Sequence, residues 1–284
     1  IATAVRKRSP ECAILFVGTH RGLEKITLPR YGFDFSPVKS AGFKNLGFVK
    51  KLKALFILPA GIVESLGLIK SFRPQVIVGL GGYSALPVMI AAVFKCIHRT
   101  IQEQNSLPGL TNRLLAPFVH YIFTSFEETL SQFPKGKTFL TGNPVREDLC
   151  TGRNTGNTPV RDHLLILGGS LGAHFINERT MICLPSLFKK FPSLTLHLQT
   201  GKHDFDAAVE AFKPFGARAR VTAFIENMKQ AYNEATLVVA RAGATTLAEL
   251  AACGIPAILI PFPHAANDHQ TKNARAFSNK NAAV

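Results

Sequence analysis

The stretch Leu164-Leu-Ile-Leu-Gly-Gly-Ser-Leu-Gly-Ala173 joins an apolar run to a glycine-rich turn, and a helix-like segment, residues 173–191, follows it. A continuous Leu/Ile run bounded by glycine is typical of a parallel strand that is buried on both faces. Glycine lets the backbone approach a neighbouring group closely, and the start of a helix presents free N–H groups. The stretch therefore predicts one strand–turn–helix unit of an open α/β sheet.

The same pattern recurs on both sides of this stretch. Further apolar runs occupy residues 12–17, 76–80, 100–102, 121–124, 138–140, 194–199, 220–222, 237–240 and 257–260. Because helical segments separate them, we expect doubly wound parallel sheets. Residues 142–162 are dense in Gly, Pro, Asn and Thr, which predicts an exposed connection. We therefore predict two Rossmann-like domains, residues 1–143 and 163–284, joined by a linker at 144–162.

Composition narrows the class of protein. Of the 284 residues, 46% are hydrophobic, and no apolar run is long enough to predict a spanning helix. The five cysteines are dispersed without CxxC spacing, which predicts reduced, buried thiols and no metal site. The net charge of +15 is uneven, because residues 1–100 hold 15 Lys/Arg against four Asp/Glu. This excess favours anionic partners such as phosphates, a membrane surface or nucleic acid, although an ordinary solvated surface is the alternative.

Three glycine-rich turns follow apolar runs, at residues 79–84, 168–173 and 241–246. Each could hold an anion at a helix start, or could merely allow tight packing between strand and helix. The turn at 168–173 lacks the acidic residue that a dinucleotide site places after the next strand, which here ends in Gln199-Thr-Gly. No GxxxxGK[ST] motif occurs either. A nicotinamide-dependent oxidoreductase and a P-loop ATPase are therefore disfavoured.

Residues 241–270 carry the richest polar pattern. Thr245 and Thr246 add hydroxyl groups at a helix start, and Glu249 follows one turn later. A carboxylate there could accept two hydrogen bonds from vicinal hydroxyls such as those of ribose, or could simply favour the helix dipole. The next apolar run ends in His264, Asn267, Asp268 and Gln270, at a sheet edge where ligands bind.

A set of sequence words, in order along nearly the whole chain, resembles the MurG family of bacterial peptidoglycan glycosyltransferases. The words are Gly79-Leu-Gly-Gly-Tyr83, Glu103-Gln-Asn105, Gly109-Leu-Thr-Asn112, Gly142-Asn-Pro-Val-Arg146, Gly168-Gly-Ser-Leu-Gly-Ala173, Phe224-Ile225, residues 241–249 and residues 264–270. The resemblance implies a GT-B fold with the active site in the interdomain cleft. It also implies inverting transfer of N-acetylglucosamine from UDP-N-acetylglucosamine to an undecaprenyl-diphosphate-linked muramoyl-pentapeptide, without cofactor or metal.

The resemblance also assigns residues. The donor-binding positions would be Ser170, Ala244, Thr245, Thr246, Leu247, Ala248, Glu249 and Gln270. The backbone of Ile225 would read the uracil edge, and Asn105 and Arg146 would contact the donor from the interdomain side. A cation at Arg146 also suits a diphosphate on physical grounds.

The general base has two candidates. Glu103, at the end of a predicted strand, is one candidate, and the alternative is a structural carboxylate that orders the following loop. The histidine of the family's first GGTGGH loop is an equal candidate, but that loop would precede Ile1. The chain also has Gln102 where the family usually has histidine, and it stops at Val284. We expect a fragment, truncated at both ends and inactive by itself.

Residues 43–73 combine bulky apolar residues with clustered lysines, as in helices that lie on anionic membranes. The alternative is a core helix with snorkelling lysines. We predict a peripheral protein on the cytoplasmic face of the bacterial inner membrane. Other functions remain open: transfer to another lipid acceptor, a UDP-sugar epimerase, or a non-catalytic module that binds anionic ligands. Nucleic acid is disfavoured, because Trp is absent and aromatic residues do not interleave with the basic ones.

Overall fold

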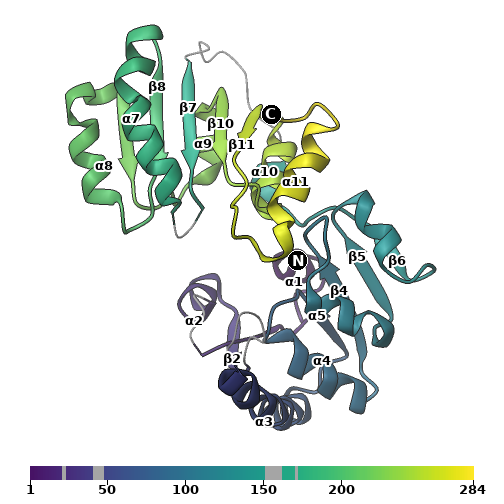
Figure 1. Ribbon diagram of the computed structural model, residues 1–284. Helices are drawn as coiled ribbons and strands as arrows, with labels where there is room; N and C mark the ends of the chain where they lie inside the picture. The colour runs from purple at the N-terminus through teal and green to yellow at the C-terminus, as the bar shows by residue number, and fades with distance from the viewer. Residues whose placement is uncertain (21–23, 41–47, 151–161, 170–171) are drawn as a thin grey trace. The chain divides into compact units, whose positions relative to one another are not determined.

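The computed structural model describes residues 1–20, 24–40, 48–150, 162–169 and 172–284. They form two compact units, Ile1–Gly142 and Asn143–Val284. The division falls one residue before the end of the first predicted domain (Figure 1). Ser170, residues 43–47 of the predicted membrane segment, and most of the predicted linker lie outside the described residues.

Parallel strands form the first unit. Its elements are α1 (Ala2–Arg8), β1 (Leu15–Gly18), α2 (Glu24–Thr27), η1 (Leu28–Tyr31), β2 (Asp34–Pro37), α3 (Phe48–Phe72), β3 (Val76–Gly79), α4 (Ala85–Phe94), β4 (His98–Glu103), α5 (Leu110–Leu115), η2 (Ala116–Phe118), β5 (Tyr121–Thr124), η3 (Glu127–Gln132) and β6 (Thr138–Leu140). β1 pairs with β2, and β3 to β6 form a four-stranded parallel sheet in chain order. Met89, Ile101 and Ile122 lie in the core between this sheet and its helices.

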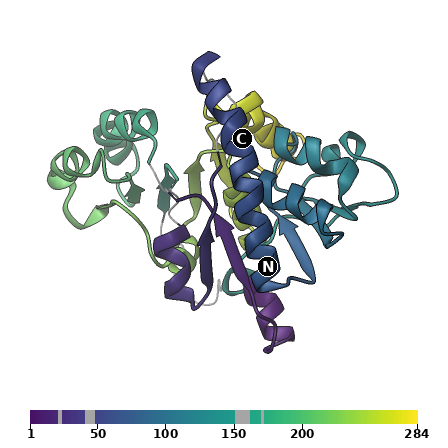
Figure 2. The ribbon, with the colours of Figure 1, turned by 90° about the horizontal axis from the view of Figure 1, so that it is seen from below.

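The long helix α3 packs on α4, and Figure 2 shows it along most of its length. Gly61, Ser65 and Ile69 are buried, and their spacing of four residues places them on one helical face. Gly61 is required there, because a Cβ atom would lie 2.1 Å from the Lys39 carbonyl oxygen. The adjoining Glu64 forms an ion pair of 2.8 Å with Lys39. This part of the segment predicted to lie on a membrane therefore has a core-facing side.

The second unit is built on one five-stranded sheet. Its elements are α6 (Glu147–Cys150), β7 (His163–Leu167), α7 (His174–Lys190), β8 (Thr195–Gln199), α8 (Phe205–Phe212), η4 (Lys213–Arg218), β9 (Ala219–Thr222), α9 (Met228–Glu234), β10 (Leu237–Ala240), α10 (Ala244–Cys253), β11 (Ala257–Leu259), η5 (Ala266–Asp268) and α11 (His269–Ser278). The strand order is β11-β10-β7-β8-β9, all parallel (Figure 1). The apolar run Leu164–Leu167 lies in the central strand β7, and Leu165, Ile166 and Leu167 are buried as that run predicts.

Two features lie at the margins of the second unit. Helix α6 falls within the predicted linker but packs on α10, where the Leu149 carbonyl accepts a hydrogen bond from Cys253 Sγ at 3.9 Å. Val284 pairs with the edge strand β11, since it accepts from Leu259 N at 2.7 Å and donates to Ala257 O at 3.0 Å. Within the described residues, we find no helix with the length and apolar character needed to span a membrane.

Candidate functional site

The turn after β10 leads directly into α10. Gly243 precedes the helix in an extended conformation, with φ of −71° and ψ of 137°, and no described side chain caps the helix start. The first backbone N–H groups of such a helix lack intrahelical acceptors, so they suit an anion. Thr245 is exposed and Thr246 half-buried, whereas Leu247 is buried in the core. Leu247 can therefore offer a ligand only its backbone, while the half-buried Ala244 and Ala248 leave space near the helix start.

Glu249 sits in a polar network within the second unit. Its Oε2 accepts a hydrogen bond from the Tyr232 hydroxyl at 2.9 Å, and Arg146 Nη2 lies 3.7 Å from Oε1. Tyr232 is buried, and burial together with the negative charge of Glu249 raises its pKa, so the hydroxyl stays a donor. The Glu249 side chain keeps 14% of its surface exposed. Because a carboxylate can accept about four hydrogen bonds, Glu249 has capacity left for a ligand.

Arg241 and Gln270 both hold the loop that follows β11. Arg241 Nη1 donates to the carbonyls of Ile260 at 3.1 Å and Pro261 at 3.0 Å, and burial lowers the pKa of its guanidinium. Gln270 Oε1 accepts from Phe262 N at 2.9 Å. Arg241 and Gln270, at the two ends of the predicted donor segment 241–270, thus both bond to the loop at residues 260–262. These bonds hold the polar residues that follow this loop in place.

The glycine-rich turn after β7 is packed against the end of β8. A Cβ atom on Gly172 would lie 2.0 Å from the Thr200 carbonyl oxygen, and Gly172 has a φ of +82°. Gln199, the last residue of β8, donates from Nε2 to Gly169 O at 2.9 Å. Tight packing alone therefore accounts for Gly172, which was the alternative interpretation of this motif. The predicted role of Ser170 falls outside the described residues.

A pocket of about 280 Å³ lies beside Ile225. Its lining residues are His197, Arg220, Thr222, Phe224, Ile225, Glu226, Asn227, Gln230, Ala231 and Glu234. The backbone of Ile225 is predicted to read the uracil edge, and its N–H already donates to Gln199 Oε1 at 3.1 Å. Burial lowers the pKa of His197 to about 4, so its ring is neutral near pH 7. Most of these residues carried no sequence signal, because they come from separate strands and a helix.

Glu103 ends β4 in the first unit and is 1% exposed. Its Oε1 accepts from the backbone N of Asn105 at 3.0 Å and from Asn105 Nδ2 at 3.3 Å. Its Oε2 accepts from Gly109 N at 2.9 Å and Asn112 Nδ2 at 2.8 Å. These contacts agree with the loop-ordering alternative, and the role of Glu103 as a base stays a prediction. Gln102 is also buried, and its Nε2 donates to Ser125 Oγ and Gly142 O, each at 3.2 Å.

His174, His203 and Asp204 form a group of potential metal ligands. The sequence predicted no metal site, because His174 lies about 30 positions before His203 and Asp204 and only the fold brings it to them. Burial alone would raise the pKa of Asp204, but hydrogen bonds from His203, Asn177 and His174 outweigh it and lower the pKa to about 2. The hydrogen bond that His174 donates to Asp204 also raises the pKa of the His174 ring.

Comparison with known proteins places the chain. Residues 1–124 match the glycosyltransferase family 28 N-terminal domain, and residues 163–284 match the family 28 C-terminal domain. Two relatives are each named UDP-N-acetylglucosamine--N-acetylmuramyl-(pentapeptide) pyrophosphoryl-undecaprenol N-acetylglucosamine transferase. The one from Citrifermentans bemidjiense is 42% identical and the one from Myxococcus xanthus 44%; each match covers 100% of this chain, and 80% and 74% of the relative, respectively.

Solved structures agree with this assignment. The crystal structure of Acinetobacter baumannii MurG is 29% identical, with a TM-score of 0.74, over 99% of this chain and 78% of that one. A UDP-N-acetylglucosamine 2-epimerase, at 13% identity and a TM-score of 0.62 over 98% of this chain and 81% of that one, shares the fold alone. The two parallel-sheet units are those of the GT-B fold, as expected from the sequence. The chain belongs to glycosyltransferase family 28 and, within it, to the MurG family.

Proposed function

We propose that this protein transfers N-acetylglucosamine from UDP-N-acetylglucosamine to an undecaprenyl-diphosphate-linked muramoyl-pentapeptide and releases UDP. The reaction is the one in the printed names of relatives that are 42% and 44% identical over the whole chain. The structural observation that carries the proposal is the network of Arg146, Glu249 and Tyr232 beside an uncapped helix start. The helix start offers a site for the diphosphate, and Glu249, within the first two turns of the same helix, can accept hydrogen bonds from sugar hydroxyls.

The donor would lie along the edge formed by α10 and the Ile225 loop. Backbone N–H groups of Ala244, Thr245 and Thr246 would face the diphosphate, and Glu249 would accept from the ribose hydroxyls. Gly243 supports close approach, because among the described residues an added Cβ would have only Thr246 Oγ1 within 4 Å, at 3.8 Å. The protein itself therefore does not require glycine there, whereas a bound phosphate would.

In the reaction, an acceptor hydroxyl oxygen forms a bond to the anomeric carbon of the sugar, and the bond from that carbon to the UDP oxygen breaks. The proton of the hydroxyl passes to a base, and UDP leaves with the electron pair. Negative charge that develops on the diphosphate is stabilised by the N–H groups and hydroxyls at the start of α10. Arg146 adds a positive charge from the same unit.

Glu103 enters the proposal as a candidate base with a competing structural role. The substitution Glu103→Gln separates the two. If Glu103 is the base, the variant should turn over about 100-fold more slowly or worse, with unchanged thermal stability and donor affinity. If Glu103 instead orders the loop, the substitution should lower the melting temperature of the first unit, because Gln cannot accept all four hydrogen bonds.

The transferase proposal is tested by UDP release with three acceptors: the muramoyl-pentapeptide lipid, diacylglycerol and none. The assay uses the 284-residue chain and any longer product of its gene. We expect the longer product to release UDP only with the muramoyl lipid. Release with diacylglycerol would favour the related lipid glycosyltransferase instead. Absence of release with every acceptor, from protein that binds UDP, would leave only a binding module.

Membrane attachment is a separate part of the proposal. The clustered positive charge of the lysines at positions 50, 51 and 53 would attract anionic lipid on the cytoplasmic side of the inner membrane. Vesicles with anionic lipid should bind the protein at low salt and release it at high salt. Replacing the three lysines by Gln should abolish this binding, while the same change at Lys189 and Lys190 should not. Equal binding to neutral vesicles would contradict the proposal.

A further inference from the structure

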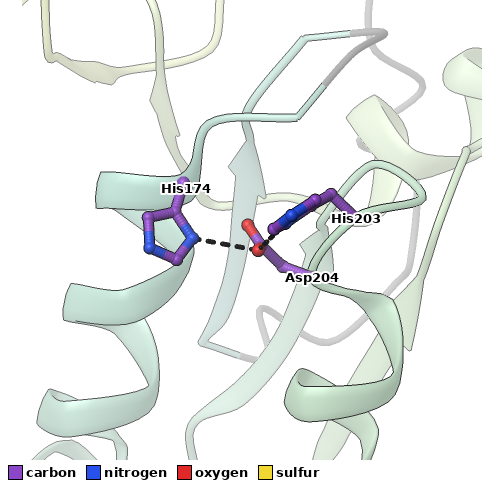
Figure 3. Close-up of side chains that lie close together, drawn as sticks. All are labelled: His174, His203 and Asp204. Carbon is purple, nitrogen blue, oxygen red and sulfur yellow. Dashed lines mark hydrogen bonds and ion pairs between the residues drawn. The ribbon is translucent and has the colours of Figure 1, made fainter.

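Two histidines converge on one carboxylate at the carboxyl edge of the second sheet (Figure 3). His174 is the first residue of α7, and His203 and Asp204 lie in the turn between β8 and α8. Asp204 Oδ1 lies 2.9 Å from His174 Nδ1 and 2.7 Å from His203 Nδ1. The ligand atoms of all three side chains lie within 4.8 Å of one another. Three potential metal ligands thus meet at one point, although they come from separate segments of the chain.

The carboxylate is held by the fold and not only by the two rings. Asp204 is 7% exposed, and its Oδ2 accepts from Asn177 Nδ2 at 2.7 Å. Asn177 is fully buried and also donates to the Thr200 carbonyl at 2.9 Å. Such a bond from a buried amide fixes the orientation of a carboxylate and leaves its other oxygen for a metal ion. The oxygen left for the ion is Oδ1, the atom that both histidines face.

The two rings are open to solvent. The side chains of His174 and His203 are 72% and 88% exposed. An ion could therefore enter from solution without any change in the core. Bonds of about 2.0–2.2 Å in tetrahedral geometry place neighbouring ligand atoms about 3.4 Å apart. The distance to Oδ1 would lengthen by about 0.5 Å for His174 and about 0.7 Å for His203, which rotation of the exposed side chains allows.

The chemistry of this donor set selects the ion. Two imidazole nitrogens and one carboxylate oxygen suit a borderline divalent cation such as Zn²⁺, whereas Mg²⁺ and Ca²⁺ prefer oxygen alone. Three protein ligands leave one tetrahedral position for water or an anionic oxygen. The alternative is that the histidines only form hydrogen bonds with Asp204, as surface side chains commonly do.

We propose that His174, His203 and Asp204 form a binding site for one borderline divalent cation, with Asn177 orienting the carboxylate. The site adjoins the turn after β7, because His174 follows that turn directly. The Thr200 carbonyl also accepts a hydrogen bond from Asn177 and packs against Gly172 of the same turn. The proposal does not rest on the transferase reaction, and binding of the ion alone tests it.

The experiment measures Zn²⁺ binding by calorimetry and the absorption spectrum of bound Co²⁺, on tag-free protein. The prediction of buried thiols was wrong for Cys12, Cys96 and Cys183, which are exposed, so the thiols are alkylated first to remove competing ligands. We expect one bound ion per chain, and we expect the Co²⁺ spectrum to be that of a four-coordinate ion. His174→Ala and His203→Ala should each lower the affinity at least tenfold, and the double variant should bind no ion at this stoichiometry. Zn²⁺ should also raise the melting temperature of the unaltered protein.

The matched control is His264→Ala, an exposed histidine of the same unit, which should bind as the unaltered protein does. Asp204→Asn, which keeps the shape of the side chain, should lose binding as the histidine variants do. Melting curves without metal identify any variant that fails to fold. If Asp204→Asn does not fold, the variants of the two exposed histidines still test the proposal. Stoichiometric binding that persists in the double variant, or no binding by the alkylated protein, would overturn the proposal.

Discussion

The turns after β7 and β10 share one sequence pattern but differ in what surrounds their glycines. Gly172, after β7, has a φ of +82°, and a Cβ atom there would lie 2.0 Å from the Thr200 carbonyl. Gly243, after β10, has a φ of −71°, and the atom nearest to an added Cβ is 3.8 Å away. The first glycine is required by the protein's own backbone, and the second is not. A glycine-rich turn therefore indicates a ligand only where packing leaves the glycine unexplained.

The largest effect that we expect is that of Gly172→Ala. The methyl group would collide with the Thr200 carbonyl, and the left-handed conformation adds strain of about 1–2 kcal/mol. We expect the free energy of unfolding to fall by more than about 3 kcal/mol in chemical denaturation. Gly169→Ala is the control, because its φ is also +82° but no atom of the described residues lies within 4 Å of an added Cβ. Equal losses in both variants would remove packing as the distinguishing cause.

Substitution of Glu249 by Gln tests the ligand side of the comparison. Gln still accepts a hydrogen bond from Tyr232 but loses the charge, so stability should change little. We expect UDP to bind about 10–100-fold more weakly in calorimetry, since a bond to a charged group contributes about 1.5–3 kcal/mol. Glu210→Gln, on an exposed helix surface, should leave UDP affinity unchanged. Unaltered affinity in the Glu249 variant would exclude it from the donor site.

Gly243→Ala sharpens the contrast with Gly172 directly. The conformation of Gly243 accommodates alanine, so the unfolding free energy should stay constant or rise by about 0.4–1 kcal/mol. A methyl group at the helix start should weaken UDP binding by about tenfold, because it occupies space that the diphosphate would use. Full retention of UDP affinity would show that both turns serve packing alone.

The smallest effect should come from Tyr232→Phe. The variant removes one hydrogen bond to Glu249 and leaves the aromatic ring in place. We expect a loss of about 1 kcal/mol in unfolding free energy and a change in UDP affinity of less than about threefold. A larger loss of affinity than that of Glu249→Gln would mean that the tyrosine itself contacts the donor.

Several apolar strands were the most predictable part of the fold. The predicted runs at 121–124, 138–140 and 237–240 match β5, β6 and β10 residue for residue. β2 was missed, because Asp34-Phe-Ser-Pro37 is short and polar and ends in proline. Helix α6 was missed because it is a single turn inside a segment rich in turn-forming residues.

The site was less predictable than the fold. The position of Glu249 at a helix start followed from the sequence, but its partners Tyr232 and Arg146 did not, because they lie 17 and 103 positions away. The four donors around Glu103 depend on the path of the loop at residues 105–112, and no local pattern specifies that path. The sequence thus indicates which side chains carry the chemistry, whereas the folded structure determines which neighbours they contact.

Gln199 joins two loops through a single amide group. Its Oε1 accepts from Ile225 N and its Nε2 donates to Gly169 O, so rotation of the amide by 180° would satisfy neither partner. A molecule that takes the Ile225 N–H must compete with this side chain, and the Gly169 carbonyl then loses its donor as well. Occupancy at Ile225 and the conformation of the turn after β7 are consequently thermodynamically linked, and any influence of one on the other is equal in the reverse direction.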